Sequence, residues 1–106
     1  MDDKDIPVTA LNPWHPITNS IDLKILGKLG EEVNELGSAI SRCIIQGVDE
    51  CEPVTKKPNK ELLENEIADV KAGVFLTEER FALDKERITA RARAKINALR
   101  QWHYMA

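Results

Sequence analysis

The sequence predicts an all-α protein, because its composition disfavours sheets and its apolar residues recur with a helical period. The chain has 106 residues, 42% apolar and only 5% aromatic, with five glycines and five prolines. A sandwich or barrel would need more turn residues and more aromatic or β-branched strands. A chain of this length forms about one small domain, whose own core is thin. We therefore expect three main helices whose four-helix-bundle-type core is completed by oligomerisation.

Residues 1–20 are predicted to form an irregular arm, since Pro7, Pro13 and Pro16 interrupt any helix there. A single helical domain then covers 21–106. Its first helix is predicted over 21–47, where apolar residues step by three and four along one face. The loop at 47–59 has two prolines and no periodicity. The apolar positions of this first helix are Leu26, Leu29, Val33, Leu36, Ile40 and Ile44.

Two further helices follow the loop. The second is predicted over 60–81, and Asp84 is placed to cap a third over 85–102. The third helix carries several basic residues on its polar faces. The apolar stripe of the second helix consists of Leu63, Ile67, Val70 and Val74. The apolar stripe of the third helix consists of Ile88, Ala92, Ile96 and Leu99.

Charge and hydropathy narrow the class of protein. The net charge is −3, which gives no reason to expect binding to nucleic acid despite the basic third helix. No apolar run approaches the roughly 20 residues that span a bilayer. The acidic N-terminus lacks an apolar signal core, so we expect a cytoplasmic protein without a membrane partner. Cys43 and Cys51 then fit free thiols rather than a disulfide or a zinc site.

The stretch LGEEVNELG gathers three carboxylates on the first helix. On a helical wheel Glu31 and Glu35 lie about 40° apart, and Glu32 and Glu35 about 60° apart. Glu32 borders the apolar stripe, whereas Glu31 points furthest from it. We therefore expect Glu32 to be half-buried and Glu31 to be exposed.

The stretch ENEIADV repeats this arrangement on the second helix. Glu66 and Asp69 share a face at the flank of the apolar stripe. In an antiparallel hairpin they can face Glu32 and Glu35. Four acids in one seam repel unless they are protonated or paired. A hard divalent cation removes the conflict, so Mg²⁺, with Mn²⁺ as an alternative, is the expected cofactor, held by Glu32, Glu35, Glu66 and Asp69.

The pair GEEVNEL and LENEIADV resembles the ExxE…ExxD signature of the MazG-like all-α NTP pyrophosphatases. The resemblance covers about residues 26–76. It implies hydrolysis of a nucleoside triphosphate, NTP or dNTP, to the monophosphate and pyrophosphate, as a house-cleaning activity on nucleotide pools. It also implies a homodimer or homotetramer. In this interpretation Glu31 or Glu35 orients or deprotonates the attacking water.

Several other residues are candidates for substrate contacts. Lys28 and Arg42 lie near the acid side of the first helix, where they can bind phosphates or simply pair with neighbouring acids. Lys56 and Lys57 can close over a triphosphate or only solubilise the loop. Trp14 and His15 can stack on a base, or Trp14 can pack as a hydrophobic side chain on the helical bundle.

Two alternative functions stay open at this point. One is a non-catalytic helical oligomerisation or adaptor module whose acids are surface charge. The other keeps the fold and makes phosphoribosyl-ATP the substrate.

Overall fold

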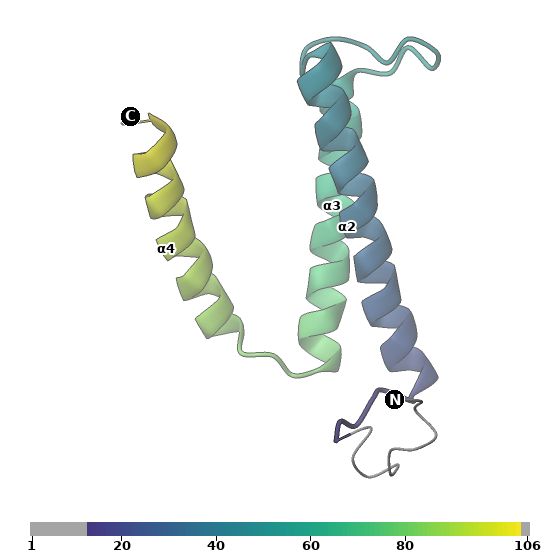
Figure 1. Cartoon of the computed structure of the whole chain (residues 1–106), viewed down its shortest axis with the longest axis vertical. Helices are drawn as coiled ribbons and strands as arrows, with labels where there is room; N and C mark the ends of the chain where they lie inside the picture. The colour runs from purple at the N-terminus through teal and green to yellow at the C-terminus, as the bar shows by residue number, and fades with distance from the viewer. Residues whose placement is uncertain (1–12, 105–106) are drawn as a thin grey trace, which may run out of the picture.

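The computed structural model describes residues 13–104, which form three helices and no strand (Figure 1). Helix α2 spans Ser20–Gln46, α3 spans Asn59–Arg80 and α4 spans Lys85–Tyr104. The predicted all-α class and its three helices are therefore confirmed, with boundaries within two residues of those expected. Most of the predicted arm, residues 1–12, lies outside the described residues, and 13–19 precede α2 without helical structure.

Helix α2 is defined by a polar cap at each end. The Asn19 side-chain oxygen accepts hydrogen bonds from the amides of Ile21 at 2.9 Å and Asp22 at 3.1 Å. At the other end the Gly47 amide donates to the Cys43 carbonyl at 2.9 Å. Gly47 has φ of 106°, a conformation that favours glycine, so the chain leaves the helix at this residue.

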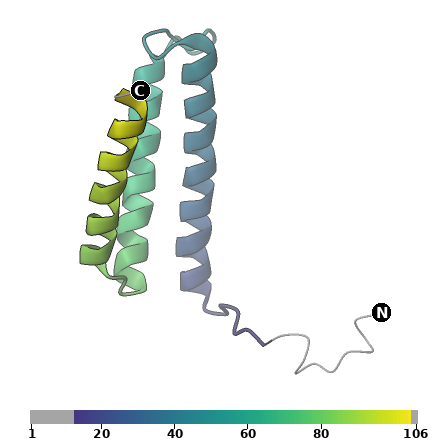
Figure 2. The same ribbon diagram turned by 60° about the vertical axis from the view of Figure 1, so that its left-hand side comes forward.

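Helices α2 and α3 lie side by side and run antiparallel, as both ribbon views show (Figures 1 and 2). The two helices are in close contact at Gly73 of α3 and Leu29 of α2. A Cβ atom at Gly73 would lie 3.1 Å from Cδ1 of Leu29. The missing side chain lets the two backbones come together, and this contact helps to set which residues of α2 and α3 face each other.

Asn59 fastens the loop end of this hairpin. It is only 1% exposed, and its side-chain amide donates to the Gln46 side chain at 3.1 Å and to the Gly47 carbonyl at 3.0 Å. Its own backbone amide donates to the Glu50 carbonyl at 2.9 Å. The first residue of α3 is thus tied to the last turn of α2 and to the loop between them.

We expect Asn59→Ala to lower the free energy of unfolding by about 2 kcal/mol. The change removes two hydrogen bonds and leaves the Gly47 carbonyl and the Gln46 side chain without this donor. Urea unfolding followed by circular dichroism measures the effect. Asn65→Ala, at an exposed position of α3, is the matched control and should change stability by less than about 0.5 kcal/mol. Equal losses in the two variants would contradict the role given to Asn59.

The open end of the hairpin is fastened by an ion pair. The Arg80 guanidinium at the end of α3 lies 2.6 Å from the Asp22 carboxylate in the first turn of α2. The same guanidinium donates to the Asn19 side chain at 3.3 Å. The hairpin is therefore held at both ends by polar contacts, and the acid pairs lie between them.

The loop at 47–58 is organised around Glu52. Hydrogen bonds from the Thr55 amide, the Thr55 hydroxyl and the Val54 amide lower the pKa of Glu52 to about 2. The Lys56 amide donates to the Glu52 carbonyl at 2.9 Å, and the Glu52 amide donates to the Lys57 carbonyl at 2.8 Å. Lys56 and Lys57 consequently belong to a compact turn at the closed end of the hairpin.

Helix α4 diverges from the hairpin along its length (Figure 1). Its first turn is capped by Asp84, whose carboxylate accepts from the Arg87 amide at 3.0 Å, as the sequence predicted. Near the turn the Lys85 ammonium lies 5.3 Å from the centre of the Phe75 ring of α3. The helix buries none of its described residues. The predicted apolar stripe of α4 is therefore exposed in the single chain.

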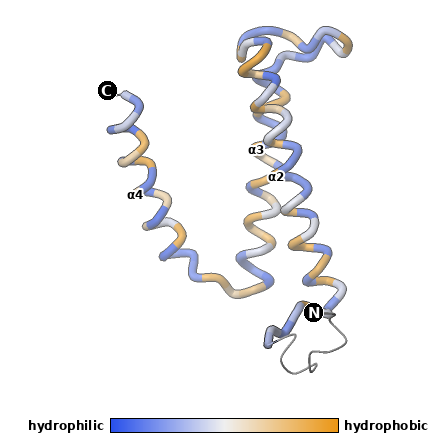
Figure 3. Tube along the Cα trace, viewed as in Figure 1, coloured by the Kyte–Doolittle hydropathy of each residue, from blue (hydrophilic) through white to orange (hydrophobic). Residues whose placement is uncertain are grey.

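The core of the single chain is sparse. Within residues 13–104, Ala39 and Cys43 are the buried apolar residues. The radius of gyration is 19.7 Å, against about 13 Å for a compact domain of this length. Apolar segments recur along all three helices (Figure 3). Both cysteines are free thiols, as predicted, and no helix in the described part of the chain is long and apolar enough to cross a membrane.

Candidate functional site

Three carboxylates from the two hairpin helices meet midway along the seam. Oxygen atoms of Glu32 and Glu35 on α2 and of Glu66 on α3 all lie within 4.8 Å of one another. The two residues of α2 are one helical turn apart and lean toward α3 on the same side. The antiparallel pairing brings Glu66 opposite them. The site thus combines residues that are 31 positions apart in the chain.

Two oxygens of this acid cluster, defined as Glu32, Glu35 and Glu66, are buried without a hydrogen-bond partner. They are Oε2 of Glu32 and Oε2 of Glu66. Glu32 as a whole is only 7% exposed. A buried polar atom without a partner is costly, typically about 1–3 kcal/mol and more for a charged group. The donor set, made only of carboxylate oxygens, fits a hard divalent cation such as Mg²⁺ or Mn²⁺.

The other oxygen of Glu32 has a cationic partner. Nζ of Lys28 lies 3.0 Å from Oε1 of Glu32 and 3.6 Å from Oε2 of Glu31. The pKa of Lys28 is raised, first by its hydrogen bond to Glu32 and then by the charge of Glu31. Lys28 therefore neutralises one edge of the cluster and leaves the buried oxygens unpaired.

Glu35 shows the electrostatic effect of the other acids. Its pKa is raised, first by the negative charge of Glu32 and then by partial loss of contact with water, with smaller contributions from Glu66 and Glu31. Lys28 opposes these effects. Mutual repulsion of this kind is what a bound cation would relieve.

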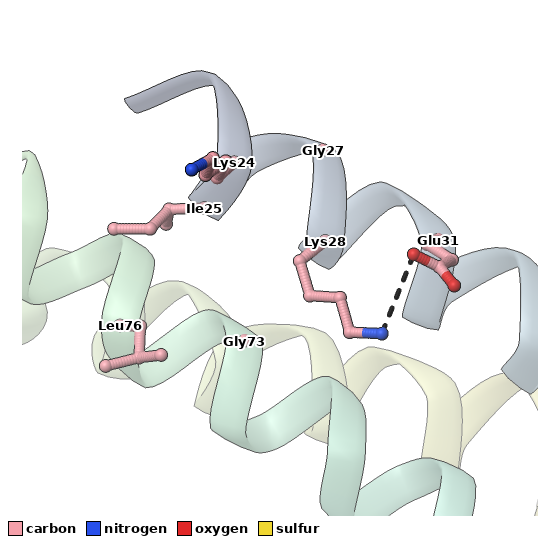
Figure 4. A pocket seen from close by; sticks show the side chains of 7 residues that line it. All are labelled: Lys24, Ile25, Gly27, Lys28, Glu31, Gly73 and Leu76. Carbon is pink, nitrogen blue, oxygen red and sulfur yellow. Dashed lines mark ion pairs between the residues drawn. The ribbon is translucent and has the colours of Figure 1, made fainter. Parts of the chain in front are cut away.

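A groove of about 540 Å³ lies beside the cluster, toward the open end of the hairpin (Figure 4). Lys28 and Glu31 form its edge nearest the acids, and their ion pair crosses that edge. Two apolar side chains, two glycines and Lys24 form the remaining walls. The lining residues are Lys24, Ile25, Gly27, Lys28, Glu31, Gly73 and Leu76.

The structure brings together most, but not all, of the acids that the sequence singled out. Glu32 is buried more fully than the half-burial expected, while Glu31 is exposed as expected. Asp69 is exposed on α3, about one turn from Glu66, and is not part of the acid cluster. Its assignment as a metal ligand remains a prediction, and the cluster itself consists of three acids rather than four.

The remaining predicted contact residues lie away from the cluster. Lys56 and Lys57 are in the loop that follows α2. The last residue of α2, Gln46, is itself about 16 Å along the helix axis from Glu35. Arg42 is exposed two turns from Glu35, and it contributes to lowering the pKa of Glu52. Trp14 and His15 are exposed ahead of α2. Their roles in substrate binding stay predictions.

The sequence leaves two roles open for Lys28, a contact with phosphate or an ion pair with a neighbouring acid. In the structure the ion pair forms, because residues three and four apart on a helix are neighbours. Lys28 pairs with Glu31 and with Glu32, one of the cluster's own carboxylates.

Comparison of the chain with known families, with curated proteins and with solved structures gives no match.

Proposed function

We propose that the protein is a divalent-cation-dependent nucleotide pyrophosphohydrolase of the MazG-like type. The observation that supports this proposal best is the pair of buried, unpartnered carboxylate oxygens on Glu32 and Glu66. A seam that gathers like charges and leaves them unpaired is unfavourable on its own. It becomes favourable when a cation and its phosphate ligand complete it.

In this proposal each residue of the acid cluster has a role that follows from its position. Glu32 and Glu66 hold the cation through their buried oxygens, and Glu35 holds it from the exposed mouth. When bound, Mg²⁺ neutralises the triphosphate and activates a water molecule. Glu31 and Glu35 are the acids at the mouth that can orient this water or accept its proton. The adjacent groove receives the rest of the nucleotide, with its apolar wall suited to the base or sugar.

A dimer is part of this proposal, because an apolar face of the hairpin is uncovered. On α2 the exposed residues Leu26, Val33, Ile40 and Ile44 follow one another along a single row. On the helical wheel this row lies on the far side of α2 from Glu35. Ile67 and Val74 of α3 are exposed on the same side of the hairpin, since the two helices run antiparallel.

The accessible area supports pairing of two such faces. The chain exposes 8950 Å², whereas a compact protein of this mass exposes about 6000 Å². The excess is larger than the roughly 800 Å² that each partner contributes to a standard interface. Two hairpins packed through these faces would form a four-helix bundle and leave both acid clusters on the outside of the shared core.

A panel of canonical and damaged NTPs and dNTPs, with phosphoribosyl-ATP included, tests the activity. We expect pyrophosphate release from at least one of them with Mg²⁺ or Mn²⁺, and none with a chelator. Release from phosphoribosyl-ATP alone would favour the alternative in which phosphoribosyl-ATP is the substrate. Failure of every substrate, together with no binding of Mg²⁺ or Mn²⁺, would refute the enzyme and favour the adaptor module.

A further inference from the structure

Lys28 occupies the position of a counter-ion at the acid cluster. Its ammonium lies within 3.0 Å of Glu32 and 3.6 Å of Glu31. Among residues 13–104, it is the cationic side chain that forms an ion pair with the cluster. Three acids of the cluster and Glu31 carry four negative charges together, and Lys28 offsets one of them.

The two side chains of the Lys28–Glu32 pair differ in solvent exposure and in conformational freedom. The Glu32 side chain is almost fully enclosed, whereas that of Lys28 is 61% exposed on a flexible stem. The Lys28 ammonium can thus move into solvent, whereas Glu32 stays in place. A divalent cation bound at the cluster would replace the ammonium beside Oε1 of Glu32, so the buried carboxylate would keep a positively charged partner.

We propose that Lys28 is an internal counter-ion that competes with a divalent cation for Glu32 and, when displaced, faces the phosphates of the nucleotide in the adjacent groove. The groove is lined by Lys28 itself and by Lys24, so a displaced ammonium remains beside it (Figure 4). An ammonium is a suitable partner for phosphate oxygens. This inference rests on the proposed divalent site.

The charge of Lys28 sets the expected size of the effect. A unit charge and a divalent ion about 5 Å apart at the water-exposed edge of a protein repel by enough to change affinity about tenfold. Lys28→Met removes the charge and keeps most of the chain length. It also leaves Oε1 of Glu32 without this partner in the cation-free protein.

Titration with Mn²⁺, followed by the electron paramagnetic resonance of the free ion and without nucleotide, tests the competition. We expect Lys28→Met to bind Mn²⁺ about tenfold more tightly than the unmodified chain. Lys28→Arg keeps the charge and should bind like the unmodified chain. Lys24→Met is the matched control, since it removes a lysine from the same groove one turn away and should change affinity by less than about threefold.

Thermal unfolding with and without MnCl₂ gives a second readout that does not depend on turnover. The rise in melting temperature on adding MnCl₂ should be larger for Lys28→Met than for Lys24→Met, because tighter binding to the folded state stabilises it more. Equal affinities and equal shifts in these two variants would overturn the role of Lys28 while leaving the divalent site intact. No Mn²⁺ binding by any variant at millimolar concentration would instead refute the divalent site, and the role of Lys28 with it.

Discussion

Glu66→Gln is expected to remove nearly all pyrophosphate release while making the cation-free protein more stable. The substitution keeps the shape of the side chain but removes one negative charge from the acid cluster and one ligand from the proposed cation site. Loss of a ligand should lower kcat/KM by at least about a hundredfold. Loss of repulsion with Glu32 and Glu35 should raise the free energy of unfolding by about 1 kcal/mol.

A loss of activity together with a gain in stability distinguishes a metal-binding role of Glu66 from a purely structural role. Activity is measured as pyrophosphate release with Mg²⁺, and stability by urea unfolding in the presence of a chelator. Glu64→Gln, two residues earlier on the exposed side of α3, is the matched control and should change neither quantity appreciably. An active Glu66→Gln variant would show that Glu66 holds no essential cation. A destabilised one would show that its carboxylate stabilises the seam rather than straining it.

Val33→Asp is expected to convert the proposed dimer into monomers. Val33 is 50% exposed at the centre of the apolar row on α2. Burying a carboxylate there, in place of an apolar side chain, should weaken association by about a thousandfold, or about 4 kcal/mol. Size-exclusion chromatography with light scattering measures the mass directly, over a range of protein concentrations.

Ile45→Asp provides the control for this change. Ile45 is 82% exposed, but it lies about 120° around α2 from Val33 and faces away from α3. This variant should remain a dimer. If the unmodified chain is a monomer, or if both substitutions dissociate it alike, the proposed interface is wrong.

Much of the fold follows from local signals in the sequence. Helix α2 ends at Gly47, and the prolines of the loop interrupt the helical period before α3 begins. Asp84 caps the first turn of α4. Such signals act over one or two helical turns, so they were sufficient to place all three helices. The burial of Glu32 followed from its position beside the apolar stripe, although its full extent depends on packing against α3.

The register between the helices is not local, and this limits what the sequence could predict about the site. Wheel geometry placed Glu66 and Asp69 on one face without deciding which of them reaches Glu32. In the structure the close contact of Gly73 with Leu29 and the fastenings at Asn59 and Arg80 select Glu66. The direction of α4 likewise depends on the short turn at 81–84 and on the contacts of α4 with other helices, which the apolar pattern of one helix does not specify.

The sparse core has a consequence for how the protein folds. Closing the α2–α3 hairpin requires only a short loop, so this step is local and carries a small entropic penalty. It buries few apolar side chains, so in the proposed dimer most of the hydrophobic stabilisation comes from a later, bimolecular step. Folding should accordingly show a fast phase independent of protein concentration, followed by a slower phase that accelerates with it. The apparent stability would then increase with the amount of protein present, as for any chain whose core is shared.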